Sequence, residues 1–341
     1  MELVLAQQII SEFLSEGKVR QIEENNKGLI NQTFVVWIEE EKKIKKYILQ
    51  SVNTNVFTKH YLTLENIIKI KKTISESSFP YQFPTPIDNK YIERENKVWR
   101  LIPYVENSVC FEKNIDTNIS YEAAKCLGNF YYSLQDFDAK DLHVTIPDFH
   151  NASKRYCQFI DAISTAKQER VSESVLLIEN ILKEKETLIK FDILNKTLPK
   201  RVCHFDTKIS NFLFDVNTNK VKALIDFDTL MPGTVLSDIG DMIRAYSNTL
   251  GEESSDFENV KADKEIINSI ISAFLEGAKS VLTEKEKSSL MFAGEALALL
   301  QCIRFLTDYL KNDIYYKTTY KKQNWVRTQN QWHLYCSLKN I

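Results

Sequence analysis

The sequence predicts an α+β protein with two lobes, and three features of the chain predict it. At 341 residues the chain is too long for one small core. Residues 1–104 combine short β-rich runs with two helical patterns, whereas the remainder shows mostly long helical periods. One β-hairpin pattern interrupts the helical part. We therefore expect a small, β-rich N-terminal lobe at 1–104 and a larger, mostly helical C-terminal lobe at 105–341.

The N-terminal lobe is expected to hold a helix, five short strands and one inserted helix. Apolar residues at helical spacing predict the helices, and runs of β-branched and aromatic residues predict the strands. A proline-rich connector at 79–86 cannot be regular helix, because each proline lacks an N–H donor and restrains its predecessor. The predicted helices lie at 2–16 and 58–76. Four of the five strands have predicted ranges, at 33–38, 46–50, 89–94 and 97–104, and the fifth is expected before the polar turn at 25–32.

The C-terminal lobe shows the helical period over five long stretches, with a hairpin between the third and the fourth. The hairpin is expected within 201–232, where two apolar runs flank a polar turn at 215–220. The predicted helices lie at 119–137, 151–163, 171–189, 264–281 and 283–311.

Composition argues against two classes of partner. Lys plus Arg number 44 and Asp plus Glu 46, so the net charge of −2 has no basic excess for nucleic acid. The longest apolar runs are far shorter than the ~20 residues of a membrane-spanning helix. The first residues also lack a basic leader with a cleavage site. We expect a cytoplasmic protein without nucleic-acid or membrane partners, as a monomer or weak homodimer.

Three polar side chains surround the predicted hairpin. Asp206 lies in a turn before the first strand, Asn211 begins that strand, and Asp226 ends its partner. Antiparallel pairing places neighbouring strands about 5 Å apart, so Asn211 and Asp226 can meet at one end of the hairpin. Phosphoryl transfer needs such a set: a carboxylate that takes the acceptor proton, and an amide and a second carboxylate that hold magnesium.

Asp and Asn also cap turns in all kinds of proteins, so any one of these positions alone indicates only a turn. Four residues at the spacing His204, Asp206, Asn211 and Asp226 favour the catalytic interpretation. His204 itself is expected to be structural, with its ring hydrogen-bonded to backbone near Asp226.

The segments HFDTKISNFLFD (204–215) and ALIDFDTLMPGTVLSDIGDMIR (223–244) resemble the aminoglycoside phosphotransferase and choline kinase superfamily. Within it, the chain looks most like the N-acetylhexosamine 1-kinases, through stretches that span nearly its whole length. These stretches are YILQSVNTNVF (47–57) with Glu65 after it, WRLIPYVEN (99–107), IPDFHN (146–151), RFLTDYLKNDIYYK (304–317) and NWVRTQNQ (324–331).

The resemblance implies a bilobal protein-kinase-like fold and an ATP-dependent phosphotransferase. Asp206 would be the general base, and Lys208 would face the transferred phosphate or the substrate. Asn211 and Asp226 would bind Mg²⁺. Asp238 is expected to be structural, bonding the catalytic loop from the start of a helix.

The resemblance also implies binding roles. Gly28, in a polar loop, and Gln50, at a strand end, would lie by the phosphates of ATP. Tyr104 and Glu106 would belong to the hinge that meets adenine. The predicted substrate-binding residues are Asp228, Arg304 and Arg327. The alternative role of Asp228 is to bind a second metal, and the two arginines are equally compatible with surface ion pairs.

Two departures from the protein-kinase pattern concern the phosphates. A single glycine, Gly28, replaces the usual glycine-rich loop, and Gln50 stands where a strand lysine normally binds phosphate. The positive charge is therefore expected from elsewhere, with Lys208, Lys27 and Lys45 as candidates.

Three functions are compatible with these residues. The first is a kinase of a sugar hydroxyl, namely the anomeric hydroxyl of an N-acetylhexosamine. The second keeps the fold but phosphorylates an aminoglycoside, choline or another amino alcohol, with Asp308 and Asp313 available to a cation. The third is a nucleotide-binding pseudokinase, suggested by the missing lysine at Gln50.

Overall fold

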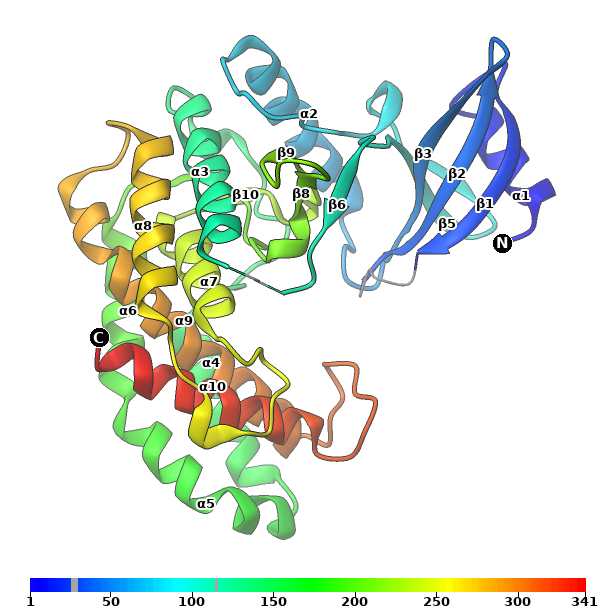
Figure 1. The fold of residues 1–341 in the computed structure, drawn as a ribbon. Coiled ribbons are helices and arrows are strands. Elements are labelled where there is room, and N and C mark those ends of the chain that lie inside the picture. The colour runs from blue at the N-terminus through cyan, green and yellow to red at the C-terminus, as the bar shows by residue number, and fades with distance from the viewer. Residues whose placement is uncertain (26–29, 114–115) are drawn as a thin grey trace.

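The computed structural model describes residues 1–25, 30–113 and 116–341. The positions of Gly28 and Lys27, both predicted near the phosphates, lie outside these residues. Figure 1 shows a twisted sheet at one side of the molecule and a larger body of helices at the other, with the C-terminus in the helical body.

The N-terminal lobe is built on a five-stranded antiparallel sheet in the order β1-β2-β3-β5-β4. Its strands are β1 (Lys18–Asn25), β2 (Gln32–Glu40), β3 (Lys43–Val52), β4 (Ile92–Arg94) and β5 (Lys97–Pro103). The short helix α1 (Leu3–Ser11) covers this sheet through Ile9 and Ile10, which are fully buried in one cluster with Phe34 and Leu49. Burial alternates along β2, where Phe34, Val36 and Ile38 are buried, because every second side chain faces this core.

Helix α2 (His60–Glu76) belongs to the first part of the chain but packs on the C-terminal lobe. Ile67, Ile70 and Ile74 lie in the same buried cluster as the helices of that lobe. The side chain of Asn66 is fully buried, and its Nδ2 donates to the carbonyl of Leu230 at 2.8 Å. These contacts hold α2 against the segment around Leu230.

A three-stranded sheet lies where the lobes meet. It contains β6 (Ser108–Cys110), β8 (Phe212–Asp215) and β9 (Val221–Leu224) in the order β6-β8-β9. A two-stranded sheet of β7 (Arg201–Cys203) and β10 (Met231–Gly233) brackets the catalytic segment. Together the two small sheets place the start of the catalytic segment and its end side by side.

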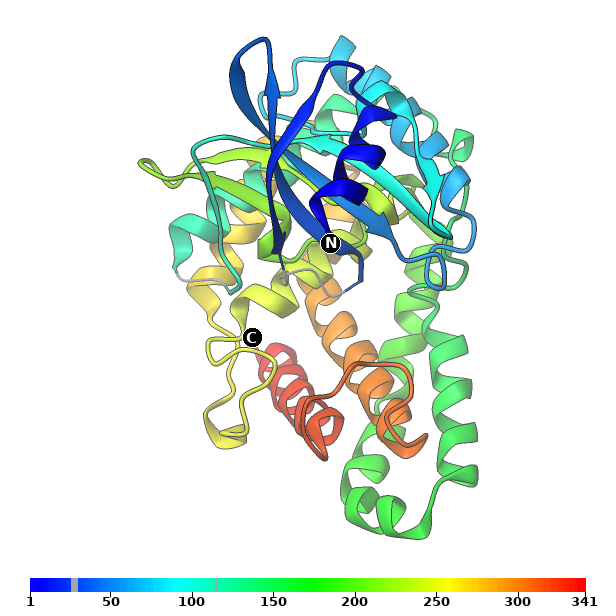
Figure 2. The same ribbon diagram turned by 90° about the vertical axis from the view of Figure 1, so that its right-hand side faces the viewer.

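Helices make up the rest of the C-terminal lobe, and Figure 2 shows them lying below the N-terminal sheet. The helix α9 runs through the interior, in contact with α4, α7 and α10. It is long and apolar enough to cross a membrane, but two thirds of its most apolar window, 67%, is buried inside the protein. The helices are α3 (Thr117–Ser133), α4 (Ala152–Thr165), α5 (Gln168–Lys183), α6 (Lys185–Thr197), α7 (Val235–Ser247), α8 (Lys264–Ala278), α9 (Glu284–Leu310) and α10 (Gln323–Lys339).

The predicted architecture is confirmed, with differences in detail. The small β-rich lobe, the hairpin and the long helices are present. The single helix predicted over 171–189 is wrong, because the chain turns at Glu184 between α5 and α6. Helix α10 was not predicted from the sequence. Its inward face carries polar residues such as Asn324, Asn330 and Gln331, which are fully buried, so the apolar period is weak there.

Candidate active site

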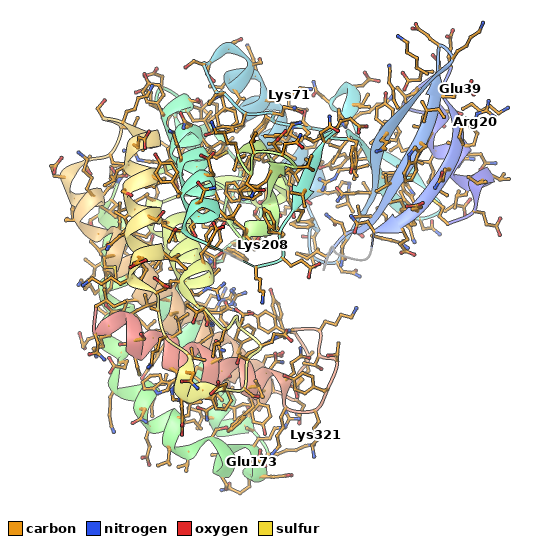
Figure 3. The ribbon with its side chains drawn as sticks, in the orientation of Figure 1. Arg20, Glu39, Lys71, Glu173, Lys208 and Lys321 are labelled. Carbon is orange, nitrogen blue, oxygen red and sulfur yellow. The ribbon has the colours of Figure 1, made fainter. Side chains whose placement is uncertain are left out.

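The catalytic segment runs from β7 through a short loop and one turn of 3₁₀ helix, Ile209–Asn211, into β8. Asp206 lies in this loop and is partly exposed, with Lys208 Nζ donating to its Oδ2 at 2.8 Å. Burial acts to lower the pKa of Lys208, but the carboxylates of Asp206 and Asp226 outweigh it and raise that pKa. Figure 3 shows the Lys208 side chain pointing downward, toward the lower part of the helical lobe.

Asn211 and Asp226 are brought together as the hairpin spacing predicts. The backbone N–H of Ile225 donates to the carbonyl of Asn211 at 3.0 Å, which sets Asp226 beside the end of the 3₁₀ turn. The Nδ2 of Asn211 donates to the carbonyl of Asp206 at 2.8 Å, so its Oδ1 is turned elsewhere. Asp226 has φ 66° and ψ 67°, a left-handed conformation that Asp adopts more readily than most residues.

The electrostatics at Asp226 suit a bound cation. Burial, together with the nearby carboxylates of Asp228 and Asp206, raises the pKa of Asp226 well above its usual range. No cluster of three His, Cys, Asp or Glu side chains in the described part of the chain is arranged to hold a metal ion. An ion at Asp226 and Asn211 thus needs further ligands, which magnesium in kinases takes from the phosphates and water. The two side chains fit that kind of site.

Two residues hold the catalytic loop from behind. The ring of His204 is fully buried, and its Nε2 lies 2.9 Å from the carbonyl oxygen of Ile225, directly before Asp226. This is the structural contact expected for His204. Asp238, in the first turn of α7, accepts the backbone N–H groups of the loop, which also agrees with the expectation for it.

Gln50 is paired with an arginine of the neighbouring strand. It lies directly opposite Arg100 of β5, and its Oε1 accepts a hydrogen bond from Arg100 Nε at 2.9 Å. The guanidinium of Arg100 also donates through Nη1 and Nη2 to the two carboxylate oxygens of Asp228, the second of these bonds measuring 2.8 Å. Both side chains are 3% exposed, so this ion pair is buried.

This contact defines the surroundings of Asp228, which the sequence placed in the substrate site. Besides Arg100, Asn31 donates to its Oδ2 at 2.8 Å. Both carboxylate oxygens of Asp228 are therefore bound by residues of the N-terminal lobe, on the side where β5 lies. In the described part of the chain, the hydrogen-bond partners of this carboxylate are Arg100 and Asn31.

The candidate cation Lys45 has another partner. Its Nζ pairs with Glu40 at 2.9 Å, near the outer turn of the β2–β3 hairpin. Of the three predicted lysines, Lys208 is thus the one that the structure places at the catalytic loop, since Lys27 is outside the described residues.

Tyr104 and Glu106 lie where the hinge was predicted, between the end of β5 and the start of β6. Lys46 of β3 lies 5.1 Å from the centre of the Tyr104 ring, and its Nζ is 3.4 Å from Glu106. The carbonyl of Glu106 accepts Lys222 Nζ of β9 at 2.8 Å. This short segment therefore touches both lobes.

Arg304 of α9 lies one aromatic ring away from the catalytic loop. Its guanidinium is 5.6 Å from the ring centre of Phe149, and Phe149 is 5.9 Å from Phe205, the neighbour of Asp206. On another side, Arg304 is 5.6 Å from the ring centre of Tyr316. Its Nη1 donates to Gln301, and no carboxylate in the described chain forms an ion pair with it.

Arg155 of α4 is a second guanidinium in this region. Its Nη2 donates to the carbonyl of Phe149 at 3.5 Å, and its Nε is buried without a hydrogen-bond partner. Burial, together with the nearby positive charge of Arg304, lowers the pKa of Arg155. The described residues provide no carboxylate within ion-pair distance of it. The pair Arg155 and Arg304 thus forms a partly buried positive site.

The other predicted arginine is engaged. Arg327 of α10 forms an ion pair with Glu253 through Nε and Nη2, with Nε 3.1 Å from the carboxylate. The acidic residues of this region are engaged too. Asp308 accepts the backbone N–H groups of 314, 315 and 316, and Asp313 pairs with Arg170 at 2.7 Å.

Two important residues were missed by the sequence interpretation. Arg100 stands in the middle of the apolar run VWRLIP, and a charged residue at a buried strand position is rare unless it is paired. That pattern was the available signal. Arg155 had no comparable signal, because an arginine on an amphipathic helix is ordinary.

A hollow of about 570 Å³ opens behind Phe205, lined among others by Phe149, Ser153, Lys196 and Gly233. It contains none of the predicted site residues. The site is therefore located by its chemistry and not by this hollow.

Known proteins share both the sequence pattern and the fold. The sequence model of the phosphotransferase enzyme family matches residues 21–259. That range includes the sheet and the catalytic hairpin, and it ends before α8, α9 and α10, which hold Arg304 and Arg327.

Three solved structures illustrate the likeness in fold. An aminoglycoside phosphotransferase from Alicyclobacillus acidocaldarius has 14% identity and a TM-score of 0.66, with 98% of this chain and 95% of that chain covered. A spectinomycin phosphotransferase, solved with ADP and spectinomycin, has 14% identity and a TM-score of 0.60, with 98% of both chains covered. A choline kinase from Cryptosporidium parvum has 14% identity and a TM-score of 0.58, with 99% and 96% covered.

The match over residues 21–259 covers most of the chain, and it includes the N-terminal sheet and the hairpin segment that carries Asp206, Asn211 and Asp226. The chain therefore belongs to the phosphotransferase enzyme family, and it is a kinase of small molecules that carry a hydroxyl acceptor.

Proposed function

We propose that this enzyme transfers the γ-phosphate of ATP to the anomeric hydroxyl of an N-acetylhexosamine. The observation that carries the proposal is Arg304, a half-buried guanidinium without a carboxylate partner in the described chain, set between Phe149 and Tyr316. Guanidinium groups donate hydrogen bonds and accept none, so they suit the hydroxyl and carbonyl oxygens of an acetylated sugar. The two aromatic rings offer apolar faces beside them.

The same surroundings argue against a cationic acceptor. An aminoglycoside or choline would be favoured by free carboxylates, or by aromatic faces that no positive side chain already contacts, whereas Arg304 lies against both Phe149 and Tyr316. Asp308 and Asp313, the acids that this alternative relied on, are bound to backbone N–H groups and to Arg170. Arg155 and Arg304 would repel a positive charge.

A pseudokinase was suggested by the missing lysine at Gln50. That argument is weakened by Arg100, which supplies a buried positive charge beside Gln50. The catalytic carboxylate, the amide and the metal carboxylate are also all present at the spacing that turnover requires.

In this proposal, Asp206 accepts the proton of the acceptor hydroxyl, which is more acidic at the anomeric carbon than elsewhere on a sugar. Lys208, whose Nζ donates to Asp206 at 2.8 Å, would orient that carboxylate and contact the transferred phosphate. Asn211 and Asp226 would hold Mg²⁺, which would neutralise charge on the phosphates. Tyr104 and Glu106 would line the adenine site at the hinge.

A coupled ADP-release assay with ATP and Mg²⁺ tests the proposal. The acceptors are N-acetylglucosamine, N-acetylgalactosamine, glucose, galactose, choline and kanamycin. Turnover on the N-acetylhexosamines, with phosphate found on the anomeric oxygen by NMR, is the expected result. Turnover on choline or kanamycin alone would overturn the substrate while leaving the family intact.

A further inference from the structure

We propose that Arg100 is a positioning residue that compensates for the missing strand lysine. It fixes the metal loop, which contains Asp226 and Asp228, to the N-terminal sheet. The inference rests on the proposed function only in treating Asp226 as the metal ligand. It requires no particular acceptor.

The register of the sheet allows Arg100 of β5 to stand in for a lysine of β3. Gln50 of β3 and Arg100 of β5 are directly opposite partners, so their side chains lie on the same face. The positive charge that kinases carry on β3 is thus moved sideways by one strand. Gln50 keeps a supporting role, since its Oε1 binds Arg100 and its Nε2 donates to Thr33 at 3.0 Å.

The carboxylate that pairs with this positive charge also differs from that of protein kinases. In protein kinases the strand lysine pairs with a glutamate of the following helix. Here Glu65 of α2 pairs instead with His143 at 2.7 Å, and α2 is docked on the C-terminal lobe. Arg100 finds its carboxylate in Asp228, two residues after Asp226. The sheet is therefore joined to the metal loop without a helix in between.

The geometry of the contact is that of a rigid clamp. Both Nη atoms of Arg100 bind the carboxylate of Asp228, Nη1 also lies 3.1 Å from the hydroxyl of Tyr91, and Nε binds Gln50. A two-pronged guanidinium–carboxylate pair fixes orientation as well as distance. A lysine cannot reproduce it, because an ammonium group is a point charge.

The clamp also reaches the loop between β1 and β2. Asn31 donates to Asp228 and accepts the backbone N–H of Asn53 at 2.9 Å. Asp228 therefore links the metal loop to β5 through Arg100, and to the start of β2 and the end of β3 through Asn31. Since Asp226 is held through Asp228, its position relative to the phosphates depends on this clamp. The positive charge of Arg100 acts on Asp226 in addition.

The test measures how nucleotide binding depends on Mg²⁺, with the non-hydrolysable β,γ-imido analogue of ATP in calorimetry. We expect Arg100→Met to need about 10- to 100-fold more Mg²⁺ for half-maximal binding, as for other residues that support a metal ligand. Affinity in EDTA should stay the same. Arg20→Met is the matched control, an exposed arginine of the same sheet paired with Glu39, and it should behave as wild type. Figure 3 shows Arg20 at the outer edge of that sheet.

Removal of Arg100 leaves Asp228 buried without a partner, which can unfold the protein. The double variant Arg100→Met, Asp228→Asn removes both charges and separates the two effects. If it is folded and still needs more Mg²⁺, the positioning role is supported. If a folded double variant has wild-type Mg²⁺ dependence, the inference is overturned.

Arg100→Lys is a third variant for the same measurement of Mg²⁺ dependence, because it keeps the charge and loses the bidentate geometry. An intermediate Mg²⁺ requirement is expected. A wild-type requirement would overturn the clamp even if both methionine variants failed to fold. Failure of the proposed function looks different. A wrong acceptor would change only the ADP-release assay, and absence of a metal site would make nucleotide binding to wild-type protein independent of Mg²⁺.

Discussion

The carboxylate of Asp238 in α7 accepts a hydrogen bond from the backbone N–H of Phe205, with Oδ1 and N 2.7 Å apart. The other oxygen, Oδ2, accepts the N–H of His204 at 2.8 Å. Phe205 has φ 64°, in the left-handed region that residues with bulky side chains rarely adopt. Asp238 thus stabilises a strained turn immediately before Asp206.

Asp238→Asn is expected to weaken this turn, because the amide nitrogen cannot accept an N–H. Hydrogen bonds to a charged group contribute about 1.5–3 kcal/mol each, so we expect the free energy of unfolding to fall by about 2 kcal/mol. The kcat should fall at least about tenfold, since a shift of Asp206 misplaces the base. Urea unfolding and steady-state kinetics measure the two effects.

Tyr131→Phe is the control for that variant. It removes only the hydroxyl that donates to Asp238 Oδ2 at 3.0 Å and leaves both backbone bonds in place. Its kcat should stay near wild type. Equal kcat losses in both variants would show that the turn at Phe205 is not what matters.

Asp206→Asn should lower kcat by about 10²- to 10⁴-fold, the usual contribution of a general base. The change is nearly isosteric, so Lys208 and the backbone of the loop keep their places. Nucleotide affinity, measured by calorimetry, is expected to change little. Retention of full turnover would exclude Asp206 as the base.

Arg304→Met is expected to raise the KM for the acceptor and to lower kcat/KM by about 10- to 100-fold, with the KM for ATP unchanged. The reason is the loss of a charged hydrogen-bond donor, worth about 1.5–3 kcal/mol. Arg327→Met should have a smaller effect, because Arg327 is already paired with Glu253. A larger loss in Arg327→Met than in Arg304→Met would move the acceptor site toward α10.

Gly277→Ala should destabilise the fold without touching the site. Helices α3 and α8 cross so closely there that a β-carbon on residue 277 would lie 2.8 Å from the backbone nitrogen of Asn129. Forcing extra atoms into a close contact costs about 1–3 kcal/mol. Ser272→Ala, on the exposed side of α8, should change stability by less than about 0.5 kcal/mol. Thermal unfolding compares the two, and equal stabilities would contradict the packing argument.

The catalytic hairpin could be predicted because its information is local. Asp206, Asn211 and Asp226 lie within 21 residues, and a two-stranded hairpin leaves few ways to arrange them. The hinge at Tyr104 and Glu106 was expected from the family resemblance and not from local pattern. Their chemistry in turnover stays a prediction.

The contacts that span the chain could not be predicted. Arg100 and Asp228 are 128 residues apart, and their meeting depends on the register of β3 with β5 and on how the lobes sit together. The packing of α2 had the same difficulty, because its isoleucines fit equally well under either lobe. Arg304 and Arg327 look alike in sequence, and only Glu253, on a distant loop, distinguishes them.

The anchoring of α2 has a consequence for control of the enzyme. Many kinases are switched on and off by a swing of the corresponding helix, which makes or breaks its ion pair with the strand lysine. Here such a swing would expose Ile67, Ile70 and Ile74, at about 1.5–3 kcal/mol for each, and would break the buried bonds of Asn66. The cost of such a swing therefore argues against rapid regulation of this enzyme through movement of α2.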